Sequence, residues 1–258
     1  MKFTRDELMT VTAARTLADG AVCFVGIGLP SKAANLARLT HAPNAVLIYE
    51  SGPIGSKPSV LPLSIGDGEL ATSADTVVPT HEIFRYWLQG GRIDVGFLGA
   101  AQIDEHANVN TTVIGDYENP RVRLPGAGGA PEIATHAKEV VLVLKHSTRS
   151  MVESLDYVTS AGFLGGRNER SAAGIPGAGP KVVITDLGVM RPDASGHLVL
   201  TSIHPGVNVD DVQAATGWAL RVADAVETTA APNEHELTTL RELEARTAAA
   251  HTRKRGLP

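Results

Sequence analysis

The sequence predicts an α/β fold with a mostly parallel, open sheet and helices on both of its faces. Through residue 50, helix and strand patterns alternate, an order typical of parallel sheets. Residues 140–144 are a continuous apolar run that suits a strand buried on both faces. The 26 glycines and the low aromatic content of 4% favour an α/β protein with many tight turns.

The first half of the chain sets out this alternation. Thr4 and Glu7 have capping-box spacing and predict a helix that ends before Gly20. The next elements are a strand at 21–26, a helix at 30–39 and a strand at 45–49. Residues 51–75 are rich in Gly, Pro and Ser and are expected to form a long loop, a feature that is often functional. Thr80 is expected to cap a helix that ends at Gln89.

The second half is expected to continue the sheet within a single domain over residues 1–258. Residues 162–180 are glycine-rich and are expected to be an exposed connection, the best candidate for a linker. The other expected elements are strands at 93–98, 140–144 and 182–185, an extended segment at 108–114, a hairpin at 187–201 around Ser195-Gly196, and helices from Asn208 and from 233 to 250. Asn233 and Glu236 have capping-box-like spacing at the start of the last helix.

Composition and charge argue against several classes of protein. The net charge of −5 gives no electrostatic footprint for nucleic acid. No apolar stretch approaches the roughly 18 residues of a membrane span. Residues 1–7 are polar and show no signal region, so we expect a cytoplasmic protein. The single cysteine, Cys23, lies in an apolar run and is expected to be a buried small hydrophobe in a reducing compartment.

Several familiar motifs are absent or incomplete. Gly26-Ile27-Gly28 follows a strand, but Ser31 replaces the third glycine of a dinucleotide-binding fingerprint, so a tight turn is favoured. The chain has no phosphate-binding G-x-x-x-x-G-K-[ST] loop and no G-x-S-x-G elbow. Its nine histidines are scattered, and none shares a helix with another at ligand spacing, so no metal site is expected.

Glu50 is the first candidate for chemistry. An apolar run, Ala45-Val46-Leu47-Ile48-Tyr49, ends directly in this carboxylate, and Gly52-Pro53 then opens a loop. Ligands of open α/β sheets bind at the carboxyl ends of strands. An ionised carboxylate in such a place is costly to desolvate without a partner or a task.

A glycine-rich segment, Gly126-Ala127-Gly128-Gly129-Ala130, offers a second feature. One interpretation is a flexible turn. The other is a loop that exposes successive backbone N–H groups to a developing oxyanion. A nucleophilic carboxylate together with such a loop would suit acyl transfer.

These residues together resemble the β subunit of class I coenzyme A transferases, in the glutaconate CoA-transferase branch. The resemblance covers nearly the whole chain and implies their NagB/RpiA-like α/β fold. The matching motifs are Val25-Gly26-Ile27-Gly28-Leu29-Pro30, Tyr49-Glu50-Ser51-Gly52, Gly99-Ala100-Ala101-Gln102-Ile103-Asp104, Asn108-Val109-Asn110-Thr111-Thr112, residues 126–130 and Asp156-Tyr157-Val158-Thr159-Ser160.

The resemblance implies a role for each site residue. Glu50 would attack an acyl-CoA thioester and then carry coenzyme A as a glutamyl thioester. Gly128, Gly129 and Ala130 would bind the acyl-CoA and its oxyanion, and Gln102 would lie near them. No metal and no permanently bound cofactor is implied, because the coenzyme A thioester is the substrate.

The resemblance also implies partners and a reaction. A separate α subunit would complete the site in a heterotetramer or larger complex. Coenzyme A would move from succinyl-CoA to a dicarboxylic acid, namely 3-oxoadipate. Glutaconate or another dicarboxylate is the alternative acceptor, and a thioester hydrolase or decarboxylase is the alternative reaction. Basic residues could pair with the distal carboxylate of the acceptor, with Arg85, Lys57 and Arg123 as candidates. A non-enzymatic, ligand-sensing module on the same scaffold is the third possibility.

Overall fold

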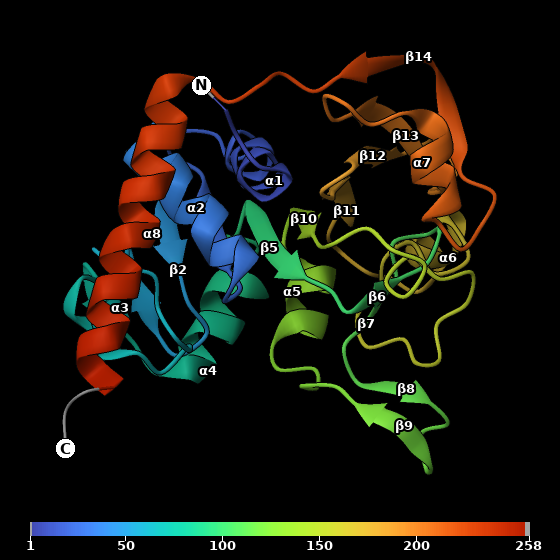
Figure 1. Ribbon diagram of the computed structural model, residues 1–258. Coiled ribbons are helices and arrows are strands. Elements are labelled where there is room, and N and C mark those ends of the chain that lie inside the picture. Colours follow the sequence, from blue (N-terminus) through green and yellow to red (C-terminus); the bar gives the residue numbers. More distant parts are fainter. Residues whose placement is uncertain (1, 256–258) are drawn as a thin grey trace.

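The computed structural model describes residues 2–255; residues 1 and 256–258 of the expected domain lie outside them. One ten-stranded mixed sheet runs through the molecule (Figure 1). In spatial order its strands are β14 (Arg221–Thr228), β13 (Leu198–Ile203), β12 (Gly188–Pro192), β11 (Pro180–Ile184), β10 (Glu139–Val143), β5 (Val95–Gly99), β1 (Val22–Val25), β2 (Val46–Ile48), β3 (Pro53–Ile54) and β4 (Thr76–Val77). Two small antiparallel pairs are β6 (Gln102–Ile103) with β7 (Val109–Asn110), and β8 (Val113–Gly115) with β9 (Pro120–Arg123).

The centre of the sheet is parallel, as predicted. Strands β11, β10, β5, β1 and β2 run side by side in one direction. Antiparallel β3 and β4 extend one edge, and β12 and β13 extend the other, where β14 lies parallel to β13. The carboxyl ends of the central strands therefore meet at one edge of the sheet, where ligands bind in such folds.

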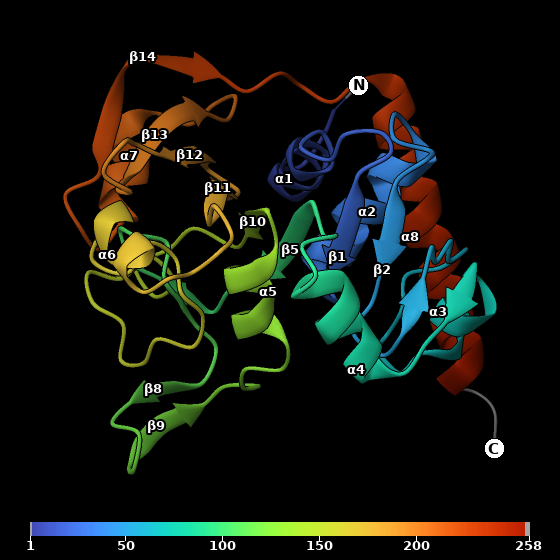
Figure 2. The ribbon, with the colours of Figure 1, turned by 180° about the vertical axis from the view of Figure 1, so that it is seen from behind.

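Helices cover both faces of this central part. Figure 1 shows α2 and α8 in front of the sheet, and Figure 2 shows α4 and α5 on the opposite side. Helix α1 packs on α2 and α8. The helices are α1 (Arg5–Ala14), α2 (Leu29–Leu39), α3 (Gly68–Thr72), α4 (Thr80–Glu82), the π-helix η1 (Ile83–Leu88), α5 (Ala130–His136), α6 (Arg167–Ala172), α7 (Val209–Ala214) and α8 (Glu234–Arg255).

The hydrophobic core lies on both faces of the central strands because successive side chains of a strand point in opposite directions. In β1, Cys23 and Val25 pack with α2 residues such as Leu36. Phe24, between them, packs with Ile133 of α5 on the other face. Cys23 is fully buried, as predicted, and this burial raises the pKa of its thiol. The continuous apolar runs in the sequence thus belong to strands that are buried on both faces of the sheet.

The capping boxes were predicted correctly. Thr4 and Glu7 bond reciprocally at the start of α1, and Asn233 and Glu236 do so at the start of α8. Helix α1 is nevertheless shorter than expected and ends at Ala14. The following residues form tight turns up to Gly20, with i→i−3 bonds that do not extend the helix.

The expectation that residues 51–75 form one long loop was wrong in part. The stretch contains β3 and the short helix α3, whose start is capped by Asp67 through the N–H of Glu69. Elements of two to five residues are too short to show a hydrophobic period, so this stretch resembles a loop in the sequence.

The helix expected up to Gln89 also differs. Pro79 precedes it, Thr80 provides no side-chain cap, and most of it is the π-helix η1. The wider turn places Ile83 and Leu88, five residues apart, both in the core.

The expectation of an exposed connection at 162–180 was wrong in part: residues 171–174 are exposed, but other residues of the segment are not. The segment contains α6, and Gly162, Phe163 and Arg170 within it are buried. The side chain of Arg170 donates to the carbonyls of Gly162 and Gly177, near the two ends of the segment, and to that of Ala134 in α5. The glycine-rich chain is therefore folded around a guanidinium group.

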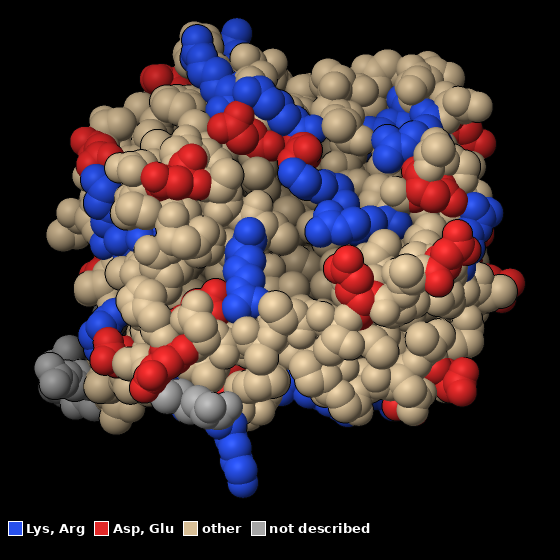
Figure 3. Space-filling model, turned by 90° about the horizontal axis from the view of Figure 1, so that it is seen from above, with Lys and Arg blue, Asp and Glu red and all other residues tan. Residues whose placement is uncertain are grey.

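Charged side chains of both signs are interspersed on the surface of the molecule. Figure 3 shows one face on which lysine and arginine side chains lie among acidic ones. Ion pairs join separate elements, for example Lys32 of α2 with Glu244 of α8 at 2.5 Å. Within the described residues, none of the helices has the length and apolar character that crossing a bilayer requires.

His146, which follows β10, makes the stability of the fold depend on pH. It is 8% exposed and lies between the hydroxyl groups of Thr185 and Thr216, at 3.0 and 2.9 Å. Burial lowers its pKa from 6.5 to about 4, against the opposing charge of Asp186. The neutral imidazole therefore stabilises the folded state above pH 6.5, and this contribution is lost as the pH falls toward 4.

We expect His146 alone to reduce the free energy of unfolding by about 2 kcal/mol between pH 7 and pH 5. Urea denaturation of the wild type and of His146→Gln at both pH values measures this contribution. The variant should show a pH dependence smaller by that amount, and other titrating groups, such as His204, cancel in the comparison. Equal pH dependence of the two proteins would contradict the prediction.

Candidate active site

Glu50 lies two residues after the end of β2, at the carboxyl end of the parallel strands. The preceding residue, Tyr49, is fully buried and faces α2, where its hydroxyl meets Ser31 at 3.2 Å and Asn35 at 3.1 Å. Burial raises the pKa of this hydroxyl, so Tyr49 stays neutral. Tyr49 packs on the α2 face, whereas the side chain of Glu50, half-buried, reaches the glycine-rich loop before α5.

The glycine-rich loop approaches the Glu50 carboxylate closely. The N–H of Gly129 donates to Oε2 of Glu50 at 3.3 Å. A Cβ atom at Gly129 would lie 2.6 Å from Cζ of Phe84 and 3.2 Å from Cδ of Glu50. Gly128 has a φ of +49°, which glycine adopts more easily than other residues. The repeated glycines are therefore required by the position of the loop, which favours the second interpretation of this segment.

A hollow of about 360 Å³ opens above Glu50 and the loop. This volume is within the range of small-molecule sites. Its walls are apolar, and Glu50 is the sole ionisable side chain among the described residues that line it. The lining residues are Phe24, Val25, Gly26, Ile27, Glu50, Ile65, Leu98, Pro125, Gly126, Ala127, Gly128, Gly129, Ala130 and Ile133.

The structure brings together most of the residues expected at the site. Gly128, Gly129 and Ala130 line the hollow with Glu50. The N–H of Ala130 is used within the loop, where it donates to the carbonyl of Ala127 at 3.1 Å. Gln102 is not among the lining residues; its buried side chain accepts a hydrogen bond from Asn110 at 2.8 Å.

None of the three basic candidates for a distal carboxylate lines this hollow in the described chain. Lys57 pairs with Asp75 at 2.6 Å. Arg123 donates to the carbonyl of Tyr117 at 2.6 Å and lies over its ring. Arg85 is exposed on η1.

Two residues were not singled out from the sequence: Ile65, which lines the hollow, and Phe84, which packs against its glycine-rich loop. Ile65 belongs to the 51–75 stretch, and its carbonyl accepts a hydrogen bond from the hydroxyl of Ser51, the residue after Glu50. Phe84 packs beside Gly129. The unusual length of the 51–75 stretch is the signal in the sequence that could have directed attention to Ile65.

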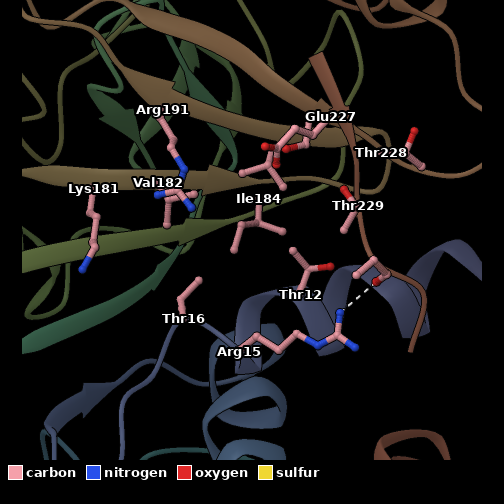
Figure 4. A pocket seen from close by; sticks show the side chains of 13 residues that line it. Thr12, Arg15, Thr16, Lys181, Val182, Ile184, Arg191, Glu227, Thr228 and Thr229 are labelled. Atoms are coloured by element: carbon pink, nitrogen blue, oxygen red, sulfur yellow. Dashed lines mark hydrogen bonds between the residues drawn. The ribbon is translucent and has the colours of Figure 1, made fainter. Parts of the chain in front are cut away.

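A second hollow, of about 370 Å³, lies apart from Glu50, between α1 and strands β11, β12 and β14 (Figure 4). Arg15 reaches along its edge and donates to the carbonyl of Ala230 at 2.8 Å. The same guanidinium group makes a bidentate pair with Glu236, at 2.8 and 2.7 Å. Arg15 thus holds the start of α8 in place, and its guanidinium N–H groups are engaged by these structural contacts.

The site around Glu50 has the groups that acyl transfer needs. A carboxylate with a free lone pair can attack an acyl carbon, and an adjacent backbone N–H can stabilise the oxygen that becomes negative. The apolar walls limit competing water at the reacting atoms.

Comparison with known proteins identifies the class. A model of the family described as coenzyme A transferase matches residues 7–215, and the chain belongs to this family. It is 66% identical over 255 residues to the B subunit of 3-oxoadipate CoA-transferase from Pseudomonas knackmussii, covering 98% of both chains.

A second relative is the B subunit of glutaconate CoA-transferase from Acidaminococcus fermentans. It is 36% identical over 232 residues, which is 87% of this chain and 86% of the relative. The crystal structure of glutaconate coenzyme A-transferase from the same organism superposes with a TM-score of 0.87 over 93% of this chain and 94% of that chain, at 33% identity. These findings confirm the family and fold that the sequence motifs predicted.

Proposed function

We propose that this chain is the β subunit of a CoA-transferase that moves coenzyme A from succinyl-CoA to 3-oxoadipate, with Glu50 as the covalent carrier. The observation that supports this most directly is the Glu50 carboxylate beside the N–H of Gly129, within an apolar hollow. The identity of 66% to the B subunit of a 3-oxoadipate CoA-transferase supports the choice of acceptor.

The reaction follows from the chemistry of a carboxylate nucleophile. Glu50 attacks the thioester carbon of succinyl-CoA, the C–S bond breaks, and a mixed anhydride and the CoA thiolate form. The thiolate attacks the Glu50 carbonyl of the anhydride, which releases succinate and leaves a glutamyl-CoA thioester. The carboxylate of 3-oxoadipate then attacks this thioester, and the returning thiolate takes the new acyl group. Each step exchanges one acyl bond for another and regenerates Glu50.

The loop amides would stabilise the tetrahedral oxyanions of these steps. The N–H of Gly129 already faces the carboxylate, so little reorganisation is needed as charge develops there. Gly128 and Ala130 shape the loop at that point. Gln102 remains a proposed contact for acyl-CoA through its amide nitrogen, because its carbonyl is engaged by Asn110.

A different subunit would complete this site. The β8–β9 hairpin extends from the body of the molecule (Figure 1). Tyr117 on its turn and the nearby Tyr157 stack at 5.4 Å and are 49% and 40% exposed, a surface suited to a protein partner. We propose an α subunit in a heterotetramer or larger assembly, a single domain for residues 1–258 of this chain, and coenzyme A thioester as a substrate with no resident cofactor. The single buried cysteine is compatible with action in the cytoplasm.

A panel of acceptors tests the reaction. The complex of this chain with its partner subunit is given succinyl-CoA and either 3-oxoadipate, glutaconate, acetate or no acid, and acyl-CoA products are separated by chromatography. We expect 3-oxoadipyl-CoA at a kcat/KM at least about tenfold above that for the other acids. A preference for glutaconate would contradict the acceptor. Rapid release of free CoA without an acid would contradict transfer and favour a hydrolase.

Gly129→Ala tests the close approach of the loop. The added methyl group would meet the Phe84 ring and the Glu50 carboxyl carbon, so one of them must move. We expect kcat for transfer to fall by about 10- to 100-fold, since small displacements of reacting groups have such effects. Gly68→Ala is the matched control, because a Cβ there meets no atom within 4 Å. Equal rates for the two variants would contradict the prediction.

A further inference from the structure

Three side chains from two separate turns converge away from the Glu50 hollow. Glu105, His106 and His197 each offer one ligand atom, and these atoms all lie within 4.8 Å of one another. Nε2 of His197 is 3.8 Å from Oε2 of Glu105, and the two imidazole rings are 4.3 Å apart, centre to centre. None of the three lines the hollow above Glu50.

Neighbouring groups orient both imidazoles. The Nδ1 atom of His106 lies 3.3 Å from the carbonyl of Gly196, which can only accept, so Nδ1 carries the proton and Nε2 the lone pair. The Nδ1 atom of His197 lies 2.8 Å from Oγ of Ser195. That hydroxyl donates to Asp193 at 2.6 Å, so it accepts from Nδ1. Nε2 of His197 then also carries a lone pair.

This chain of hydrogen bonds is the arrangement found around metal-bound histidines, whose second nitrogen donates to a carbonyl or toward a carboxylate. The same oxygen of Asp193 also accepts hydrogen bonds from the backbone N–H groups of Ser195 and His197, at 2.8 and 3.1 Å. Its other oxygen pairs with Arg221 at 2.6 Å. The guanidinium group of Arg167 lies over the Phe163 ring, 4.5 Å from its centre, and its Nε donates to the carbonyl of Asp193.

The two turns are already fixed to each other by the backbone. The N–H of Leu198, next to His197, donates to the carbonyl of Glu105 at 2.8 Å. The N–H of Phe163, in the neighbouring 162–180 segment, also holds the first turn, by donating to the carbonyl of His106 at 2.9 Å. The side chains of Glu105 and His197 are 41% and 22% exposed, so an ion can reach them from solvent. The three ligand atoms, within 4.8 Å of one another without an ion, would draw closer around an ion with ligand distances of about 2.0–2.2 Å.

We propose that Glu105, His106 and His197 form a binding site for a divalent transition-metal ion, with Zn²⁺ as the best chemical match and water as a fourth ligand. Two imidazole nitrogens and one carboxylate oxygen are a ligand set that Zn²⁺ takes, whereas Mg²⁺ and Ca²⁺ prefer oxygen alone. The ion would join the turn after β6 to the β12–β13 turn. The histidines stand 91 positions apart, a separation that no local ligand spacing predicts.

Titration of the full chain, stripped of metal with EDTA and then dialysed, tests the site. Calorimetry with ZnCl₂ should give one equivalent bound per chain, and thermal unfolding should shift upward with added ZnCl₂, since the ion binds the folded state. CoCl₂ should give the intense visible absorption of a tetrahedral site. Absence of stoichiometric binding would overturn the proposal.

Variants locate the site. His197→Gln and Glu105→Gln should each remove the equivalent of bound Zn²⁺ and the thermal shift, with circular dichroism unchanged. Ser195→Ala should weaken binding by about 10- to 100-fold, because it removes the group that orients His197. His136→Gln is the matched control, since His136 pairs with a single carboxylate, Glu132, at 3.1 Å and should leave binding intact. Full binding by both His197→Gln and Glu105→Gln would also overturn the proposal.

Discussion

Replacing Glu50 by glutamine is expected to abolish coenzyme A transfer and to leave the fold intact. The amide has the size of the carboxylate but is not nucleophilic, so no anhydride or thioester can form. Removal of a covalent nucleophile reduces kcat by several orders of magnitude, and we expect a loss on the order of 10⁴-fold or more. The substitution weakens the 3.3 Å hydrogen bond that Gly129 donates, and this bond contributes little to stability.

Two measurements check this prediction. Steady-state transfer from succinyl-CoA gives the rate loss, and circular dichroism with urea denaturation confirms the fold. In a second experiment the wild-type complex is incubated with acyl-CoA and reduced with borohydride, and mass spectrometry locates the modified residue. The reduced side chain should be Glu50, and the Glu50→Gln complex should carry no label.

Glu132→Gln is the matched control for Glu50. Glu132 lies in the first turn of α5, close to the glycine-rich loop, and pairs with His136 outside the hollow. We expect transfer by this variant to stay within a few-fold of the wild type. Substantial activity of Glu50→Gln, or a label on another residue, would show that Glu50 is not the nucleophile.

Replacing Arg170 by methionine is expected to cause the largest loss of stability from a single substitution in α6. Arg170 is 4% exposed, and its guanidinium group donates to the carbonyls of Ala134, Ala161, Gly162 and Gly177 at 2.6 to 3.3 Å. Burial lowers its pKa to about 10, so it remains charged at neutral pH. Among the described residues no carboxylate forms an ion pair with it, and the carbonyl dipoles compensate the charge.

Methionine fills a similar volume but leaves four carbonyl oxygens without a donor. Each such buried group costs about 1–3 kcal/mol. Relief of the buried charge offsets part of this cost. We therefore expect the free energy of unfolding to fall by about 3–5 kcal/mol. Urea denaturation followed by circular dichroism measures the change. Arg170→Lys should give an intermediate loss, because one ammonium group cannot reach all four carbonyls.

Arg167→Met is the control within the same helix. The guanidinium group of Arg167 is more exposed, lies over Phe163 and bonds one carbonyl. Its loss should cost about 1 kcal/mol. If Arg170→Met destabilises the protein no more than Arg167→Met, the carbonyl cluster does not depend on the guanidinium group.

The part of the fold that could be predicted depends on patterns within one element. Capping boxes at Thr4 and Asn233 involve residues three positions apart, and the buried strands are continuous apolar runs. The elements that were missed are short, such as α3, or have an unusual helical turn, such as η1. Neither type has a hydrophobic period long enough to distinguish it from a loop or from an α-helix.

In the candidate site, too, the residues that could be predicted are those marked by a local pattern in the sequence. Glu50 and residues 126–130 were recognised because an acid after an apolar strand and a run of glycines are local signals. Gln102 was placed by resemblance, and the structure locates its side chain beside Asn110, outside the hollow. Phe84 and Ile65 join the site through packing that no local pattern encodes.

By itself the sequence determined the class of fold, the family and the residue on which the chemistry is proposed to depend, because each rests on motifs read along one stretch of chain. Only the tertiary structure decided that Gly129 lies against Glu50, 79 positions away, that Arg170 binds the carbonyls of three separate segments, and that His106 meets His197. The contact between Gly129 and Glu50 depends on how parallel strands bring their carboxyl ends and following loops to one edge of the sheet. That convergence is a property of the whole topology, so no single segment contains it.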